Sequence, residues 1–540
     1  MATVADLVIA QLRAAGSQVL FGVPGGGGNL DLIEAAGRVG MPFVLTSTET
    51  AGAIAALAQS EVSGCCGACL TTLGPGAASV INGVACAYLD RAPLLVFTDN
   101  YAPSTHGVFE HQRLDNIALL RPITKWSTTL VSATAADTIN KALGIAVNGC
   151  PGPVHLDCPD GVVNQPVDPV RLSETGNGVS KGVEQEMALR CSTLDPNFDR
   201  LVSNASRPLL LVGLGARRNE DAIAIRELCA RRNVPAMVTY KAKGVVPDSH
   251  PLFAGVFTNA QIERDIINES DLLIGIGLDP VELIPRPWKH PQPIIYCGRW
   301  PVEDRHLPFT SQLIGDIPSA VQRIESTLQR SAWNDDKLRA RVQAQRAAIC
   351  GTASGMTAQH VVKTAARTLA PHVRVTVDAG AHMFPSTLLW PADLPNQMLI
   401  SNGLSTMGFA LPAAIGAAMA DRQRPVVALT GDGGLLMCAG ELLTAARENL
   451  RIIVIVFNDE SLSLIEVKQK ARHYQPAGVA LGEVRWSALA ESLGVPAHSV
   501  RTARDLERVT KTALDGSGPT LIDARIDRAD YGIVLRAIRG

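Results

Sequence analysis

Aromatic side chains are scarce in this sequence, at 4% of its 540 residues, and no long run of residues carries one sign of charge. Lysine and arginine together number 49 against 51 aspartates and glutamates, which leaves a formal net charge of -2. A nucleic-acid-binding or membrane-surface protein usually presents a basic face, so the composition favours neither class of partner. Alanine and glycine abound instead, and the interior must therefore be built from small and aliphatic side chains.

The sequence also lacks a stretch of about 20 apolar residues free of charge, glycine or proline, which a membrane-spanning helix needs. Its start, MATVADLVIAQLRAAG, has the pattern of an amphipathic helix that Asp6 and Arg13 interrupt. A signal peptide has a basic start and an unbroken apolar core, so this segment is not typical of one. We expect a cytoplasmic protein with no membrane partner.

Cysteine is present in an odd number, 11, scattered along the chain. The segment CCGACL contains a C-x-x-C spacing, but no second Cys or His pair lies nearby at the spacing of a metal site. We interpret Cys65, Cys66 and Cys69 as buried structural thiols, with a redox or metal role as the alternative.

At 540 residues the chain is too long for one compact core, since domains average about 150 residues. Apolar strand patterns alternate with helical ones, which predicts parallel sheets covered by helices on both faces. We expect an α/β protein of three doubly wound parallel-sheet domains, at residues 1–163, 190–328 and 355–540. A polar linker at about 164–197 follows the first domain, and a charged helical stretch at 335–346 precedes the third.

Short apolar runs bounded by turn residues predict the strands of these domains. In chain order they are 19–23, 42–45, 69–72, 94–98, 154–156, a run within 208–215, 234–239, 271–277, 373–377, 426–429, 452–457 and 520–523.

The strongest functional motif lies in the third domain. The strand at 426–429 leads into Thr-Gly-Asp-Gly-Gly and then a helix expected to end near Asn449, while the strand at 452–457 ends in Asn-Asp-Glu-Ser. Parallel strands end at the same edge of a sheet, where open α/β folds bind ligands. Gly431, Gly433 and Gly434 let backbone N–H groups approach a phosphate, and the start of the following helix favours its charge.

Acidic residues at both strand ends indicate a metal. Asp432 and Asp459 supply the hard oxygen ligands that Mg²⁺ or Ca²⁺ prefers, and a backbone carbonyl near Ser461 completes the protein's share. A Gly-Asp-Gly sequence alone is usually only a tight turn. The preceding strand, the following helix and the second acidic strand end together favour a site for a metal-bound diphosphate.

The run GDGGLLMCAGELLTAARENLRIIVIVFND resembles the thiamine-diphosphate-dependent enzymes, the superfamily that contains acetolactate synthases and pyruvate decarboxylase. Other segments resemble acetolactate synthases in the same order along the chain: FGVPGGGGNLDL, TETAGAIAAL, TTLGPGAASVINGVACAYLDRAPLLVFT, PITKW, PGPVHLDCPDGV and SNGLSTMGFALPAAIGA. The resemblance implies pyrimidine-binding, middle and diphosphate-binding domains, with thiamine diphosphate and Mg²⁺ as cofactors. It also implies a homodimer or homotetramer whose sites lie between subunits.

The resemblance assigns roles to residues of the first domain. Glu49 matches the catalytic glutamate, which hydrogen-bonds the aminopyrimidine so that the cofactor can lose its thiazolium proton. A surface glutamate is the alternative, although its place after a strand and at a helix entry favours the functional role. The family usually has Arg-His before this glutamate, where this chain has Ser47 and Thr48. Gln112 matches a glutamine that lines the substrate side, although a polar loop residue is an equal alternative.

Further matches lie in the third domain. Met407 matches the bulky apolar residue that holds the cofactor in a bent conformation, with a core methionine as the alternative. The Ser405 backbone is expected to meet the pyrimidine amine, where the family has glycine. Ala379, Gly380 and His382 resemble a segment that touches the diphosphate, although His382 alone could be a surface histidine.

Pocket residues separate the reaction classes within the family. Pyruvate decarboxylases carry an acidic residue after the Pro-Gly turn and a His-His pair; this chain has Gly26 and His111-Gln112, which favours ligation to a second carbonyl over simple release of an aldehyde. Leu464 and Lys468 replace the Met and Trp of biosynthetic acetohydroxyacid synthases.

The middle domain has no recognisable FAD segments, and Gly213-Leu-Gly215 lacks the third glycine of a dinucleotide turn. We therefore expect no FAD. We expect a 2-oxo acid such as pyruvate as substrate. A decarboxylase or lyase acting on a larger substrate and a non-catalytic binder are the alternatives.

Overall fold

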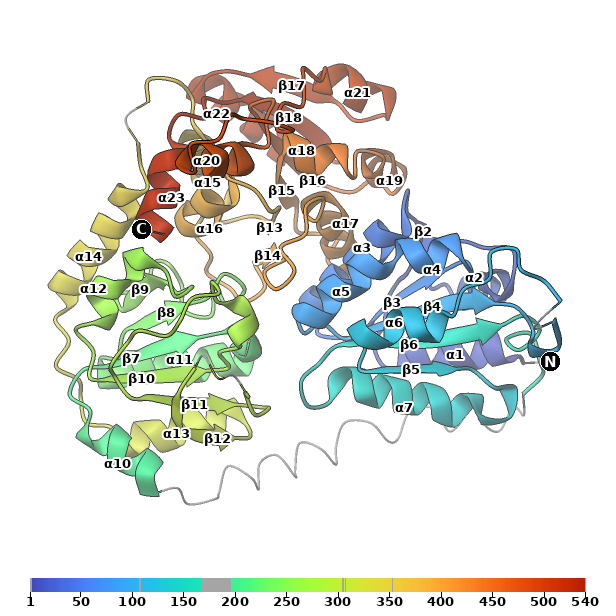
Figure 1. Cartoon of the computed structure of the whole chain (residues 1–540), viewed down its shortest axis with the longest axis horizontal. Helices are drawn as coiled ribbons and strands as arrows, with labels where there is room; N and C mark the ends of the chain where they lie inside the picture. The colour runs from blue at the N-terminus through green and yellow to red at the C-terminus, as the bar shows by residue number, and fades with distance from the viewer. Residues whose placement is uncertain are drawn as a thin grey trace.

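The computed structural model describes residues 2–105, 108–167, 196–303, 305, 307–351 and 353–539. These residues form three α/β domains, each built on a six-stranded sheet in which all neighbouring strands run parallel, with helices flanking the sheets (Figure 1). The predicted fold class is therefore confirmed. Most of the predicted linker lies outside the described residues, and the exact domain boundaries stay a prediction.

The first domain has the strand order β2-β1-β3-β4-β6-β5. Its strands are β1 Leu20–Val23, β2 Phe43–Leu45, β3 Gly67–Thr71, β4 Leu94–Asn100, β5 Trp126–Thr129 and β6 Pro153–Pro159. Its helices are α1 Val4–Ala14, α2 Gly28–Arg38, α3 Glu49–Ser63, α4 Pro75–Ser79, α5 Ile81–Leu89, α6 Asn116–Leu120 and α7 Ala135–Val147. Cys66 and Cys69 are buried, and burial raises the pKa of the Cys66 thiol to about 12, as expected for structural thiols. Cys65 is only partly buried, so the prediction of a buried thiol is wrong at that position.

The middle domain has the strand order β12-β11-β10-β7-β8-β9. Its strands are β7 Pro208–Val212, β8 Ala236–Val238, β9 Phe253–Val256, β10 Leu272–Ile276, β11 Ile294–Gly298 and β12 Phe309–Ile314. Its helices are α10 Pro196–Asn204, α11 Asn219–Arg232, α12 Arg264–Ile267 and α13 Ile317–Thr327, followed by the connecting helix α14 Asp335–Ala348. A Cβ atom on Gly213 would lie 2.5 Å from the Leu278 Cα, so close packing of two turns explains this glycine.

The third domain has the strand order β14-β13-β15-β16-β18-β17. Its strands are β13 Arg374–Val377, β14 Met398–Ile400, β15 Val426–Gly431, β16 Ile452–Asn458, β17 Ala497–Val500 and β18 Thr520–Arg525. Its helices are α15 Ala358–Leu369, α16 Met383–Leu389, α17 Ala410–Ala420, α18 Asp432–Leu436, α19 Glu441–Arg447, α20 Ser463–Ala471, α21 Trp486–Ser492, α22 Ala503–Leu514 and α23 Tyr531–Arg539.

The single helix predicted from the Gly-Asp-Gly turn to Asn449 is wrong, because the chain forms two short helices, α18 and α19, with a turn at residues 437–440. Gly440 lies in that turn against the first domain, where a Cβ atom would meet the Ser47 Oγ at 2.9 Å. The turn lets α19 present Glu441 to the first domain. A tertiary contact thus overrides the local helical pattern.

Helices α3 and α17 join the first and third domains at the centre of the molecule (Figure 1). A Cβ atom on Gly416 of α17 would lie 1.9 Å from the backbone oxygen of Ala55 in α3, so the two helices touch backbone to backbone. One hydrophobic cluster contains side chains of both domains. The abundance of small residues noted in the sequence is what allows this contact. No helix in the described parts of the chain is long and apolar enough to cross a bilayer.

Candidate active site

The ends of β15 and β16 lie side by side at one edge of the third sheet. Asp432 follows β15 directly and is buried, and Asp459 follows β16. The Oδ2 atom of Asp432 accepts the N–H groups of Asp459 at 3.2 Å and Glu460 at 2.7 Å. The structure thus brings the two predicted metal ligands together, and we call residues 430–434 and 458–461 the clamp.

The clamp concentrates negative charge in a buried place. Burial raises the pKa of Asp432, and burial together with the neighbouring Asp432 raises the pKa of Asp459 to about 7. Neither carboxylate forms an ion pair with another described residue. The described residues also contain no group of three His, Cys, Asp or Glu side chains placed to hold a metal. A cation bound between the two carboxylates would therefore need further oxygen ligands, which a diphosphate supplies.

Ser461 lies in the turn between β16 and α20. Its N–H group donates to Oδ1 of Asp459 at 3.1 Å, and its hydroxyl donates to Oε2 of Glu466 at 2.9 Å. Since the hydroxyl is engaged with Glu466, the backbone carbonyl is the part of Ser461 left to serve a metal, as the sequence predicts.

The glycines of the clamp are confined by their own surroundings. A Cβ atom on Gly433 would lie 2.7 Å from the Leu462 Cδ2 and 3.4 Å from the Met407 Cε, and one on Gly434 would lie 2.6 Å from the Asp378 Oδ2. Side chains at these positions would displace the neighbouring loops. The glycines are therefore needed for packing as well as for the approach of a phosphate.

His382 lies beside the same turn and is buried, not at the surface. Its ring stacks on Phe457 with the centroids 4.9 Å apart, and a Cβ atom on Gly431 would lie 3.2 Å from its Cε1. Burial lowers the pKa of His382 to about 3, so the imidazole is neutral at neutral pH. Its Nε2 is buried without a hydrogen-bond partner among the described residues. Such an orphaned polar atom is costly unless a ligand satisfies it.

Asp378, which the sequence reasoning missed, ties the loops of the site together. Its carboxylate accepts hydrogen bonds from the Gly408 N–H at 3.0 Å, the Thr430 hydroxyl at 2.9 Å and the Ala379 N–H at 2.8 Å. Burial raises its pKa to about 6. Its position, directly after a buried strand, was the available signal.

Ser405 and Met407 lie in the loop between β14 and α17. Ser405 is exposed and has φ +54°, a left-handed conformation in which glycine is usual, which explains the family preference at this place. The half-buried Met407 reaches the Gly433 turn of the clamp. Both predicted cofactor contacts are therefore at the clamp edge of the sheet.

Glu49 is the first residue of α3 and is half-buried. A Cβ atom on Gly76 would lie 3.3 Å from its Oε1. The N–H groups of Ser47 and Thr48 donate to Oε1 of Glu441 in α19, at 2.9 and 3.2 Å. The residues that replace the usual Arg-His therefore anchor the entry of α3 to the third domain through their backbone.

Gln112 lies near Glu49, across one turn of the first domain. It is exposed with φ +56°, and a Cβ atom on Gly74 would lie 2.5 Å from its carbonyl oxygen. Because Gly74 precedes α4 and Gly76 lies in its first turn, Glu49 and Gln112 both lie close to the start of this helix. No hydrogen bond between the described residues joins either side chain to the clamp.

Leu464 and Lys468 lie one turn apart on α20. Leu464 packs against two hydrophobic clusters that consist mainly of third-domain side chains and include some of the middle domain, so it contributes to the core. Lys468 is exposed, and partial burial together with the cations of Arg539 and Arg472 lowers its pKa. This stretch of helix thus offers an apolar surface followed by positive charge.

The clamp has the chemistry of a site for a divalent cation and an anion. Asp432 and Asp459 can bind a cation, and the neutral imidazole of His382 has an Nε2 atom without a hydrogen-bond partner among the described residues. The N-terminus of α18 begins at Asp432 itself and favours an anion. These residues fit a metal-bound diphosphate.

Comparison with known proteins identifies the family. Three models of thiamine pyrophosphate enzymes match: the N-terminal TPP binding domain at residues 2–119, the central domain at 199–324 and the C-terminal TPP binding domain at 378–524. The catabolic acetolactate synthase of Raoultella terrigena is 28% identical over 98% of this chain and 96% of its own. The acetolactate synthase of Bacillus subtilis is 28% identical over 97% and 93%.

A third relative carries a different name. The probable 2-ketoarginine decarboxylase of Pseudomonas aeruginosa is 28% identical over 97% of this chain and 94% of its own. Relatives with two activities thus match over nearly the whole chain at the same identity. The three domain models in their proper order and the full-length similarity lead to one conclusion: the chain belongs to the thiamine pyrophosphate enzyme family and is acetolactate synthase-like.

Proposed function

We propose that the protein uses thiamine diphosphate and Mg²⁺ to decarboxylate pyruvate or a similar 2-oxo acid and to join the product to a second carbonyl compound. The observation that carries the proposal is the clamp, with its paired, unneutralised carboxylates Asp432 and Asp459 beside the orphaned Nε2 of His382. These groups suit a metal-bound diphosphate: no ion pair among the described residues involves either carboxylate, although both accept hydrogen bonds, and the Nε2 of His382 has no hydrogen-bond partner among them.

Each group of the clamp has a role in binding. Asp432, Asp459 and the Ser461 carbonyl would hold Mg²⁺, and the backbone N–H groups of residues 431–434 together with His382 would meet the diphosphate. Gly380 permits the close approach of His382, since a Cβ atom there would lie 2.8 Å from the ring. Asp378 would hold the loops that contain Thr430 and Gly408 in their relative positions.

The remaining residues act at the reacting end. Thiamine diphosphate, when bound, supplies an acidic thiazolium carbon that adds to a 2-oxo acid and accepts the electrons of decarboxylation. Met407 would support the bent cofactor, the Ser405 backbone would meet the pyrimidine amine, and Glu49 would exchange a proton with the pyrimidine. Gln112 and Leu464 would line the space for the substrate.

Glu49 would act on the cofactor held by a second copy of the chain. Within one chain no described hydrogen bond links Glu49 to the clamp, although both are required. Exposed apolar side chains follow the clamp in α18, α19 and the turn between them, namely Leu436, Met437 and Leu443, which are 43%, 61% and 47% exposed. A homodimer or homotetramer would cover them and complete each site.

A decarboxylase acting on a larger substrate is the second candidate. The similarity to a probable 2-ketoarginine decarboxylase favours it, as does Lys468 where biosynthetic acetohydroxyacid synthases carry tryptophan. Ligation remains the first candidate because the chain has Gly26 and Gln112 where pyruvate decarboxylases carry acid–base groups for releasing an aldehyde.

Product analysis tests the proposal. The protein is incubated with thiamine diphosphate, Mg²⁺ and a panel of 2-oxo acids that includes pyruvate. Formation of acetolactate supports ligation, and an aldehyde alone supports the decarboxylase. No turnover of any 2-oxo acid by cofactor-bound protein would contradict both and indicate a binding protein without catalysis.

Substitution of Glu49 tests its role separately. We expect Glu49→Gln to lower kcat by about 10²- to 10⁴-fold, the range for loss of a proton-transferring group, while thiamine diphosphate still binds. Glu34→Gln is the matched control, because it makes the same change at an exposed glutamate of the first domain that has no role in the proposed site. Full activity of Glu49→Gln would refute the assigned role.

A further inference from the structure

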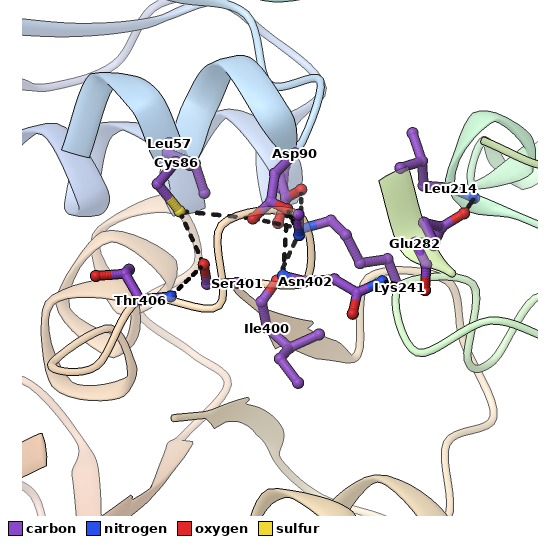
Figure 2. A network of polar contacts seen from close by, with 12 residues as sticks. Leu57, Cys86, Asp90, Leu214, Lys241, Glu282, Ile400, Ser401, Asn402 and Thr406 are labelled. Atoms are coloured by element: carbon purple, nitrogen blue, oxygen red, sulfur yellow. Dashed lines mark hydrogen bonds and ion pairs between the residues drawn. The ribbon is translucent and has the colours of Figure 1, made fainter. Parts of the chain in front are cut away.

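A group of buried charges lies where the three domains meet. We call Glu61, Asp90, Arg217 and Lys241 the three-domain charge cluster. The Nζ atom of Lys241, in the middle domain, lies 2.8 Å from Oε1 of Glu61 and 3.4 Å from Oδ2 of Asp90, both in the first domain. It also donates to the Ile400 carbonyl of the third domain at 3.0 Å (Figure 2). The Lys241 side chain is only 1% exposed.

The cluster neutralises its own charges. Arg217 lies 2.8 Å from the same oxygen of Glu61, so two cations face two carboxylates. Burial opposes the charge of Lys241, but Asp90 and Glu61 outweigh it and raise the pKa of the ammonium group. Burial likewise opposes the charge of Glu61, but Lys241 and Arg217 lower the pKa of its carboxyl group. The side chains of Glu61, Asp90 and Lys241 are almost inaccessible to water, so their charges are stabilised by one another and not by solvation.

Asp90 connects the cluster to the loop that follows β14. Its Oδ1 accepts the backbone N–H groups of Asn402 at 3.2 Å and Gly403 at 2.9 Å (Figure 2). The Ser401 hydroxyl oxygen accepts the Thr406 N–H group at 3.2 Å, which closes the loop on itself. Asp90 thus holds two backbone N–H groups of the loop, and the Ser401 hydroxyl holds a third.

The other end of this loop is fixed at the clamp. Asp378 accepts the N–H groups of Gly408 at 3.0 Å and Phe409 at 3.4 Å. Residues 401–408 are thus held at both ends, and the exposed Ser405 with its left-handed backbone lies between the two attachments.

We propose that Lys241 is a positioning residue of the middle domain that, with Asp90, sets the loop 401–407 for the pyrimidine end of the cofactor. The proposal rests on the proposed function, because it assigns Ser405 and Met407 to the pyrimidine side. It gives the middle domain, which contributes no residue to the clamp, a direct influence on cofactor binding.

Lys243 offers a matched control two residues further on. Its side chain is 0% exposed and lies 3.0 Å from Asp248. Asp248 also reaches the third domain, where its Oδ2 accepts the Ala392 N–H at 3.1 Å. Both lysines are therefore buried, paired and part of a domain contact, but of the two only Lys241 has a described contact with the end of β14 that leads into the loop 401–407.

The test compares Lys241→Met with Lys243→Met. Thiamine diphosphate affinity in saturating Mg²⁺ is measured by quenching of tryptophan fluorescence, and stability by the melting temperature without cofactor. We expect Lys241→Met to weaken binding by about 10-fold or more, as for other residues that orient ligating groups, and Lys243→Met to stay near the wild-type affinity at a similar loss of stability. Equal affinities of the two variants would overturn the proposal.

A milder variant covers the case in which Lys241→Met does not fold. Ser401→Ala removes one oxygen atom, the acceptor of the Thr406 N–H, and leaves every charge of the cluster in place. We expect weaker binding with a small fall in melting temperature, because the buried Thr406 N–H loses its acceptor; unchanged binding would contradict the proposed control of the loop.

The same measurements separate this proposal from the proposed function. A wild-type protein that fails to bind thiamine diphosphate would contradict the proposed function itself. A wild-type protein that binds it, with both lysine variants alike, would contradict only the role of Lys241.

Discussion

The clamp and the three-domain charge cluster are both buried groups of charged side chains, but their charges are arranged in opposite ways. In the cluster, Lys241 and Arg217 face Glu61 and Asp90, and the charges cancel within the protein. In the clamp, Asp432 and Asp459 face each other, no Lys or Arg side chain among the described residues forms an ion pair with either, and burial raises the pKa of both.

This difference distinguishes structural charge from functional charge. A buried group that is satisfied by its neighbours contributes to the fold, whereas one left unsatisfied raises the free energy of the folded protein until a ligand binds. The orphaned Nε2 of His382 belongs to the second kind. Four substitutions test this distinction.

The largest effect on stability is expected in the cluster. Glu61→Gln removes one negative charge and leaves two buried cations facing Asp90 alone, so we expect the free energy of unfolding to fall by about 3–5 kcal/mol. Urea denaturation measures it. The matched control is Glu34→Gln, because Glu34 is 73% exposed and its pair with Arg38 should contribute under about 1 kcal/mol. A similar small change in both variants would show that the cluster is not held by its charges.

The next largest effect is expected on ligand binding at the clamp. Asp432→Asn removes a carboxylate proposed to hold Mg²⁺, and we expect thiamine diphosphate affinity in Mg²⁺ to fall by about 100-fold. Isothermal titration calorimetry measures it. Asp157→Asn is the control, since Asp157 is equally buried but bonded to Thr98 and Asn116 in the first domain. Wild-type affinity of Asp432→Asn would refute the metal site.

A pH-dependent effect is expected beside the cluster. Burial raises the pKa of Glu282 from 4.5 to about 8, so the folded protein holds a proton there that the unfolded chain releases. The contribution of Glu282 to the free energy of unfolding is therefore fully present below about pH 4.5 and is lost as the pH rises through about 8. Glu282→Gln can keep the hydrogen bonds to the Thr239 hydroxyl and the Leu214 N–H. We expect its free energy of unfolding to exceed that of the wild type by more than about 1 kcal/mol at pH 8. Parallel stability curves of the two proteins between pH 5 and pH 8 would contradict this expectation.

The smallest effect is expected from reducing the charge repulsion between the two carboxylates of the clamp. Asp459→Asn can keep hydrogen bonds with the Ser461 N–H and the Ser463 hydroxyl while it removes repulsion from Asp432. We expect it to stabilise the cofactor-free protein by about 1 kcal/mol at neutral pH and to leave one oxygen for the metal. Calorimetric melting without cofactor measures the gain. A loss of stability would show that the paired carboxylates are not a source of strain.

All central strands except β11 were predicted from the sequence, and most edge strands were not. β1, β10, β15 and β16 are continuous apolar runs because helices cover both faces of the sheet there. The edge strands β5, β9, β12, β14 and β17 were missed. An edge strand such as β5, Trp-Ser-Thr-Thr, is only partly covered and carries polar residues, so its apolar pattern is weak.

The candidate site divides in a similar way. The sequence places Asp432 and Asp459 at neighbouring strand ends, because motif and strand order together imply their proximity. The position of Asp378 directly after a buried strand was a signal that the prediction missed. The contacts of Asp378 and the burial of His382 could not be predicted, since their neighbours come from loops far along the chain. The middle-domain Lys241 looked like any surface lysine, because nothing within its own segment shows its partners.

The sequence by itself determined the fold class, the family and the clamp, since apolar periodicity and strand-end glycines and carboxylates are local patterns with few structural solutions. Only the tertiary structure decided which buried charges form ion pairs within the protein, as in the cluster, and which do not, as in the clamp. The physical reason is that the free energy of a buried charge depends on the groups within a few ångströms of it, and here Lys241 draws those groups from three domains.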